Sequence, residues 1–202
     1  MRIRTIVAGT AALALLAGCD TSGGGTTGTP TSASQPTSGT DSGGAPKIQN
    51  PLNLAAFEAD PCSTVTPAQV QSFGLPGVTG KVNTTAPGPA CNWLGSSTPA
   101  KMAPSVGILP EGTNLSTILP KKDTTYQVFE SLPDIQGYPS YVALSVDQRK
   151  EGNCSVLTGV SDAKAILFTF QSDEGSPKFA DPCGAATEFA TLAITTIKAG
   201  AK

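Results

Sequence analysis

Histidine is absent from all 202 residues of this chain, and its absence removes several kinds of chemistry at once. Ser-His-Asp and Cys-His centres need an imidazole base, and His-containing zinc and haem sites need an imidazole ligand. Carboxylates, serine hydroxyls and lysine amines are the groups that remain for acid–base or nucleophilic work. An enzymatic interpretation is thereby narrowed to carboxylates or to a serine that works without histidine.

Two serine motifs have spacings that occur in enzymes. Ser161 and Lys164 have the S-x-x-K spacing in which a lysine activates a serine. Residues 40–44, Thr-Asp-Ser-Gly-Gly, resemble the nucleophile loop of chymotrypsin-like proteases. The first motif lies in a predicted turn and lacks a Lys-Thr-Gly partner, and the second lies in a low-complexity segment without a histidine base. Both are interpreted as non-catalytic.

Paired carboxylates are the remaining route to hydrolysis, because glycoside hydrolases place two of them across the scissile bond. The candidates are Glu111, Glu130, Asp134 and Asp147. Nothing in their spacing places two of them together, and no P-loop, dinucleotide or EF-hand pattern is present. We therefore expect no catalytic residues, no metal and no cofactor. A histidine-independent cell-wall hydrolase that uses paired carboxylates is the alternative.

Aromatic residues are few, at 5% of the chain, and three of them are candidates for ligand contact. Trp93 shares a predicted strand face with Cys91, which favours packing over a disulfide rather than stacking on a ligand. Tyr138 and Tyr141 flank Pro139 and are the candidates for lining a ligand groove, the alternative being a simple strand-entry turn.

The N-terminus has the pattern of an export signal. Arg2 and Arg4 precede an apolar run over residues 5–15, which is too short to span a membrane. The sequence Leu-Ala-Gly-Cys at 16–19 resembles the bacterial lipobox, in which the cysteine receives a diacylglycerol. We therefore predict a signal peptide over residues 1–18 and attachment through Cys19 to the outer face of the cytoplasmic membrane, since two acyl chains anchor stably.

Residues 19–50 are predicted to be the lipidated cysteine and a flexible tether. From Asp20 to Asn50, 22 of 31 residues are Gly, Ser, Thr or Pro, a composition with too little apolar surface to offset the entropy of ordering. The formal net charge is −2, and Arg149 is the only arginine outside the signal. This charge pattern excludes nucleic acid as a partner, because nucleic acid requires clustered basic residues.

Residues 51–202 are predicted to form a single domain held by two disulfides. Four cysteines in an exported chain, Cys62, Cys91, Cys154 and Cys183, imply two bridges. Three connectivities are possible, and the equal spacing of 29 residues favours Cys62 with Cys91 and Cys154 with Cys183. A four-cysteine metal site is disfavoured because the chain has no CxxC pair.

Helix signals stand near both ends of this domain, and strand signals lie between them. The first helix is predicted from Thr66-Pro67 to Gly74 and the last from Asp181-Pro182 to Gly200. Period-two alternation or strand-forming composition predicts strands near 91–94, 105–109, 126–132, 141–146, 154–156 and 165–170, with a short helix at 114–119. We predict an α+β fold, an antiparallel sheet of five or six strands packed with an N-terminal and a C-terminal helix.

The order of these motifs resembles that of a family of actinobacterial lipoproteins catalogued as domain of unknown function 3558. The features that carry the resemblance are the lipobox, the tether, Asp60-Pro61-Cys62, Leu75, Cys91-Asn92-Trp93, Gly137-Tyr138-Pro139, Cys154-Ser155-Val156 and Pro182-Cys183. The resemblance implies an envelope lipoprotein with two structural disulfides and supplies no catalytic residues. We expect a non-enzymatic binding or accessory module for a wall component, a lipid or a partner protein. A purely structural envelope protein is a further alternative.

Overall fold

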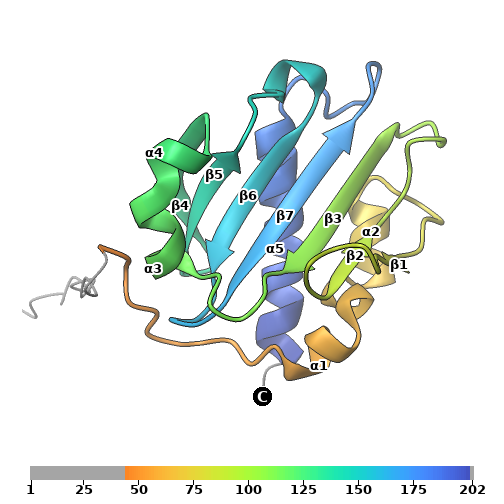
Figure 1. Ribbon diagram of the computed structural model, residues 1–202. Helices are drawn as coiled ribbons and strands as arrows, with labels where there is room; N and C mark the ends of the chain where they lie inside the picture. Colours follow the sequence, from red (N-terminus) through yellow and green to blue (C-terminus); the bar gives the residue numbers. More distant parts are fainter. Residues whose placement is uncertain (1–43, 201–202) are drawn as a thin grey trace, which may run out of the picture. The chain divides into compact units, whose positions relative to one another are not determined.

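The computed structural model describes residues 44–200, in which one antiparallel sheet of seven strands packs with helices (Figure 1). The strands are β1 (Lys81–Val82), β2 (Ala90–Asn92), β3 (Met102–Ile108), β4 (Val128–Ile135), β5 (Tyr138–Leu144), β6 (Cys154–Gly159) and β7 (Ala165–Ser172). Their order across the sheet is β1-β2-β3-β7-β6-β5-β4. The α+β prediction is confirmed, with one strand more than expected, because β1 has only two residues and so shows no alternation.

The helices are short except for the last. They are α1 (Ala55–Ala59), α2 (Pro67–Phe73), α3 (Leu115–Ile118), α4 (Lys122–Thr125) and α5 (Pro182–Gly200), with 3-10 turns η1 (Pro61–Thr64), η2 (Leu119–Lys121) and η3 (Arg149–Glu151). Within residues 44–200, none of these helices is both long and apolar enough to cross a membrane.

The two predicted helices begin and end where their capping residues lie. Thr66 accepts a hydrogen bond from the Gln69 N–H while the Gln69 side chain accepts one from the Thr66 N–H, and left-handed Gly74 ends α2. At α5, Asp181 Oδ1 accepts a hydrogen bond from the Gly184 N–H at 2.9 Å. Such caps satisfy backbone groups that a helix leaves unpaired at its ends.

The α5 face of the sheet holds the main core. α5 lies across the back of the strands in Figure 1 and packs chiefly on β7 and β6. Phe189 of α5 makes edge-to-face contacts with Phe73 at 5.0 Å and with Trp93 at 5.2 Å between ring centroids. Trp93 is 1% exposed, so the expectation that it packs in the core is met.

The opposite face, here called the open face, is covered only in part. Leu115 and Ile118 of α3 pack on Leu157 and Ala165 in a second, smaller hydrophobic cluster. Gly159 permits this contact, because a Cβ built on it would lie 2.3 Å from Leu115 Cδ1. The rest of the open face, over β3, β7 and the start of β6, is not covered by α3 or α4 (Figure 1).

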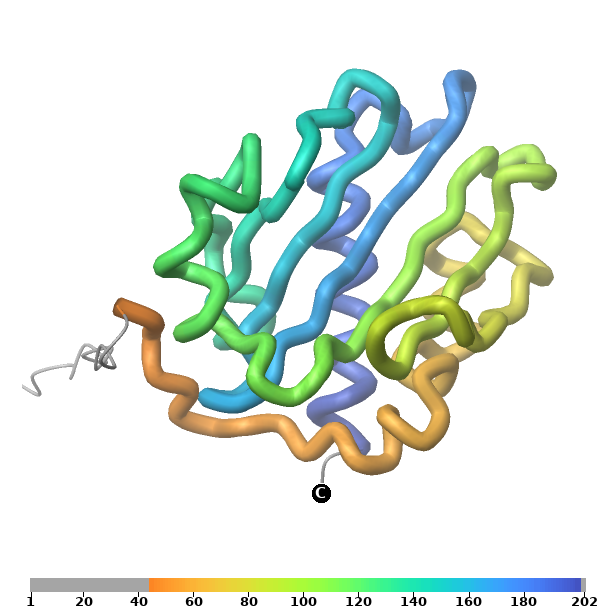
Figure 2. The backbone as a smooth tube through the Cα atoms, in the orientation of Figure 1, coloured from red at the N-terminus to blue at the C-terminus, as the bar shows by residue number. Residues whose placement is uncertain are grey.

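The segment before α1 belongs to the domain, which corrects the predicted boundary at residue 51. Ala45 and Ile48 are buried, and the Ile48 N–H donates to Asp162 Oδ1 at 3.0 Å. Figure 2 shows this segment running beneath the strand ends towards α1. The predicted signal peptide, Cys19 and the tether up to residue 43 lie outside the described residues.

Both disulfides join the cysteines that the spacing favours. Cys62–Cys91 ties η1 to β2, and Cys154–Cys183 ties β6 to the first turn of α5. Each therefore fastens a helical segment from one end of the domain to the sheet.

Candidate functional site

The S-x-x-K motif forms a turn and not a nucleophile. Ser161 Oγ accepts hydrogen bonds from the backbone N–H groups of Ala163 and Lys164, at 3.2 and 2.9 Å. The Lys164 amine pairs instead with Glu58 of α1 at 2.8 Å. The lysine that would have to activate the serine is thus engaged elsewhere. Thr40 to Gly43 of the second serine motif lie outside the described residues.

Two of the four candidate carboxylates meet at a single arginine. Arg149 makes a bidentate pair with Asp147, Nε to Oδ1 at 2.9 Å and Nη2 to Oδ2 at 2.8 Å, while Nη1 reaches Glu130 Oε1 at 3.3 Å. Glu130 and Arg149 also line a cavity of about 450 Å³, together with Leu132, Val142, Lys150, Phe179, Ala180, Asp181, Pro182 and Cys183. Sequence spacing did not predict that Glu130 and Asp147 contact the same arginine, because Glu130 lies on β4 and Asp147 lies in the segment after β5.

Asp147 is not poised to act as a general acid. Hydrogen bonds from Arg149 hold the pKa of Asp147 down, to about 2, so that carboxylate is ionised at neutral pH. A glycoside hydrolase needs one carboxyl group to be protonated before reaction. Asp181, the other carboxylate at this cavity, accepts from the Gly184 N–H as the cap of α5. The arrangement is that of structural ion pairs.

Tyr138 and Tyr141 do not line a common groove, which corrects the tentative groove. They stand three residues apart on β5, and side chains three apart on a strand point to opposite faces. Tyr138 is buried on the α5 face, where its hydroxyl donates to the Asn50 carbonyl at 2.8 Å. Tyr141 packs on the open face, stacked on Phe129 at 5.0 Å between ring centroids.

The open face has a floor without charge. Strands β2, β3, β5, β6 and β7 contain no Asp, Glu, Lys or Arg. The register of the strands places two neighbouring rows of residues across this face. One runs through Gly107, Leu167, Leu157 and Tyr141, and the other through Asn92, Ser105, Thr169 and Ser155. At about 4.8 Å between strands, each row is about 14 Å long, and Leu157 in the first row is buried where α3 packs on it.

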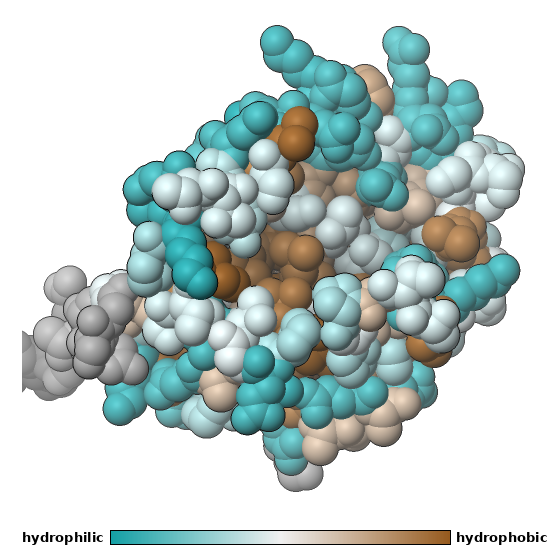
Figure 3. Space-filling view, viewed as in Figure 1, coloured by the Kyte–Doolittle hydropathy of each residue, from teal (hydrophilic) through white to brown (hydrophobic). Residues whose placement is uncertain are grey.

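This floor is hollowed and walled. Figure 3 shows a depression in the middle of the open face, with hydrophobic side chains inside it and hydrophilic ones along its upper rim. A cavity of about 150 Å³ lies between the floor residues Ser105, Gly107, Leu167 and Thr169 and the loop at Asn83 and Ala86–Gly88. On the other side stand the stacked Phe129 and Tyr141, where burial raises the pKa of the Tyr141 hydroxyl and keeps it a donor.

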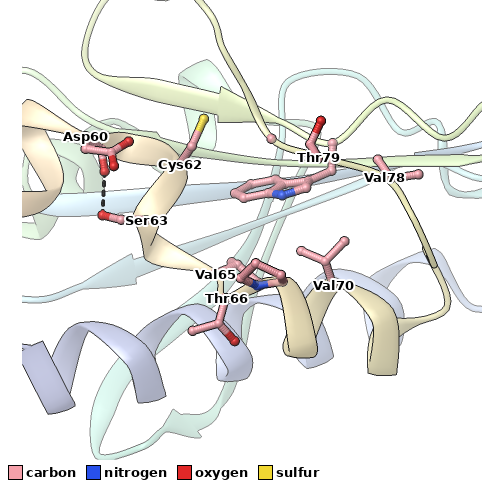
Figure 4. Close-up of a pocket in the computed structure, with 11 residues that line it drawn as sticks. Asp60, Cys62, Ser63, Val65, Thr66, Val70, Val78 and Thr79 are labelled. Atoms are coloured by element: carbon pink, nitrogen blue, oxygen red, sulfur yellow. Dashed lines mark hydrogen bonds between the residues drawn. The ribbon is translucent and has the colours of Figure 1, made fainter.

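A third cavity lies beside η1 and α2 (Figure 4). It measures about 350 Å³ and is formed by η1, α2, the loop at 78–80 and Trp93. Its walls are largely apolar, with Val65, Val70 and Val78 among them, and Cys62 of the first disulfide is at its edge. Sequence reasoning found Trp93 but not this cavity, since the loop that closes it has no strand or helix pattern.

Residues 44–200 thus define a disulfide-linked α+β domain with two concave, mainly uncharged surfaces. Within those residues no three His, Cys, Asp or Glu side chains are grouped to hold a metal ion. The chain belongs to the family described as protein of unknown function (DUF3558), whose model matches residues 14–196. Neither a curated protein nor a solved structure gives a significant match to this chain.

Proposed function

We propose that the protein is a lipid-anchored envelope lipoprotein of actinobacterial type, attached through diacylglycerol on Cys19 to the outer face of the cytoplasmic membrane. The lipobox at residues 16–19 and the export signal before it support the anchor. Two disulfides support an oxidising, extracytoplasmic location, because such bonds are rare in the cytosol.

The domain acts as a non-enzymatic binding module whose ligand is a wall component, an uncharged polysaccharide chain. The observation that carries this proposal is the charge-free floor of the open face. A charged ligand group placed on this floor would lose its water without gaining an ionic partner, which is costly. An uncharged sugar chain has hydroxyls for Asn92, Ser105 and Thr169 and apolar ring faces for Leu167 and Tyr141.

The experiment places a charge in the middle of this floor. The Cys19→Ala chain, expected to leave the membrane fraction, serves as the soluble parent and is titrated calorimetrically with neutral oligosaccharides of glucose, galactose, arabinose and N-acetylglucosamine. At least one should bind saturably. Thr169→Asp should weaken that binding at least tenfold, because the new carboxylate would be desolvated under the ligand.

Thr195→Asp is the matched control, since Thr195 is exposed on α5, which packs against the other face of the sheet. It should bind like the parent. The proposal fails if no neutral oligosaccharide binds, or if Thr169→Asp binds as tightly as Thr195→Asp. Binding only to phospholipid vesicles or to a captured protein would likewise overturn the sugar assignment.

A further inference from the structure

The indole N–H of Trp93 has no hydrogen-bond acceptor among the described residues, although the side chain is 1% exposed. Buried donors are almost always satisfied. Every side-chain nitrogen and oxygen that is sealed from solvent within residues 44–200 has a partner. The indole N–H is therefore not sealed in the core, and it opens onto the 350 Å³ cavity that Trp93 lines.

Gly80 fixes this edge of the indole at the cavity. A Cβ built on Gly80 would lie 3.1 Å from Trp93 Nε1 and 2.6 Å from Cys91 Sγ. Only a residue without a side chain can pass so close to both groups. Because Gly80 also lines the cavity, the nitrogen-bearing edge of the ring faces the same space.

The polar groups around the cavity are mostly engaged within the protein. Ser63 Oγ donates to the Asp60 carbonyl at 2.7 Å (Figure 4), and Thr66 Oγ1 accepts from the Gln69 N–H at 3.3 Å. What the cavity offers to a ligand is apolar wall, the Trp93 indole donor and the hydroxyl of Thr79, with the exposed Asp60 also among the lining residues. At about 30 Å³ for a water-sized group, 350 Å³ holds about twelve heavy atoms.

We infer that this cavity binds a medium-length acyl ester, with the acyl chain against Val65, Val70 and Val78 and an ester oxygen accepting the Trp93 N–H. The ester is preferred to the free acid because no Lys or Arg of the described residues lines the cavity, so a buried carboxylate would lose its water without gaining a cationic partner. This site is separate from the proposed sugar-binding floor. It is formed by the η1–α2 segment and the 78–80 loop, and no open-face floor residue lines it.

Trp93 is the only tryptophan in the chain, so its fluorescence and its single indole N–H cross-peak report on this site alone. The probes are methyl octanoate, which has eleven heavy atoms, and octanoate at pH 8, both added to the full Cys19→Ala chain. The ester should shift both signals saturably, and octanoate should bind at least tenfold more weakly.

Val78→Phe fills the cavity and should abolish the ester response while leaving the circular dichroism and the thermal midpoint close to those of the parent. Thr169→Asp, which alters only the open face, should leave ester binding unchanged. The inference is overturned if the ester gives no saturable shift, or if Val78→Phe folds and still binds. An ester that shifts fluorescence without moving the indole N–H cross-peak would also overturn it.

Discussion

At the scale of single residues, Arg149 forms ion pairs with two of the carboxylates near η3. Its guanidinium holds Asp147 in a bidentate pair and reaches Glu130 with the remaining nitrogen. Such pairing favours the ionised form of Asp147. Two acidic residues that meet at one arginine are thus a salt-bridge cluster, and their proximity alone does not indicate hydrolysis.

The Asp147–Arg149 pair predicts a specific titration. The pKa of Asp147 is lowered from 3.8 to about 2, so its stabilising contribution is present above pH 4 and lost as the pH falls towards 2. Carbon-detected NMR should find the Asp147 midpoint near 2, and Arg149→Met should move it back towards 3.8. Glu130→Gln is the control. It should leave the midpoint in place, because Nε and Nη2 still pair with Asp147. A midpoint near 3.8 in the parent would contradict this account.

The tyrosine groove was wrong for a reason that the sequence already contained. Tyr138 and Tyr141 both flank Pro139, but an interval of three residues in a strand places two side chains on opposite faces. The two side chains are therefore close along the chain but separated by the sheet. The uncharged floor of the open face could also be predicted from the sequence, because five strands that are neighbours in the sheet contain no charged residue.

At the scale of elements, the helices could be predicted from their capping residues. Segments without a helix or strand pattern could not be predicted from the sequence. Thr66 and Asp181 mark helix starts through side-chain hydrogen bonds, and Gly74 marks a helix end through its left-handed conformation. The segment from Gly44 to Asn50 is rich in turn residues, yet Ile48 is buried by contacts with distant parts of the chain. The strand predicted near 141–146 extended too far, since β5 ends at Leu144 and Val146 is 57% exposed.

The contact of α3 with the sheet depends on the absence of a side chain at Gly159. A Cβ there would lie 2.3 Å from Leu115 Cδ1, so Gly159→Ala should displace α3 and lower the free energy of unfolding by about 1–3 kcal/mol. Urea denaturation measures this change. Adding Leu115→Ala should relieve the clash and give a favourable coupling between the two sites.

Gly107→Ala is the matched control for this prediction. Gly107 lies on the same face of the sheet, and a Cβ built on it would meet nothing closer than 3.8 Å. Its effect on stability should stay within about 0.5 kcal/mol. Equal effects of Gly159→Ala and Gly107→Ala would show that α3 is not held by this close approach.

At the scale of the whole molecule, the two disulfides enclose separate stretches of chain that meet in one core. Cys62–Cys91 and Cys154–Cys183 each close a loop with a sequence separation of 29, and the loops do not overlap. Phe189 of α5 nevertheless contacts both Trp93 and Phe73, so the segments fastened by the two bridges pack on each other. The domain should therefore unfold as one cooperative unit.

This arrangement predicts additive stabilisation by the two bridges. A loop of this size contributes about 3–4 kcal/mol when closed, chiefly by restricting the unfolded chain. Cys62→Ala/Cys91→Ala and Cys154→Ala/Cys183→Ala should each lower the free energy of unfolding by that amount in urea denaturation. Because the loops are disjoint, the fourfold variant should lose both contributions to within about 0.5 kcal/mol. That loss approaches the whole stability of an ordinary domain, so the fourfold variant should be marginally folded at best. A fourfold variant as stable as either double variant would contradict additivity. It would show that each bridge stabilises the domain only when the other is present.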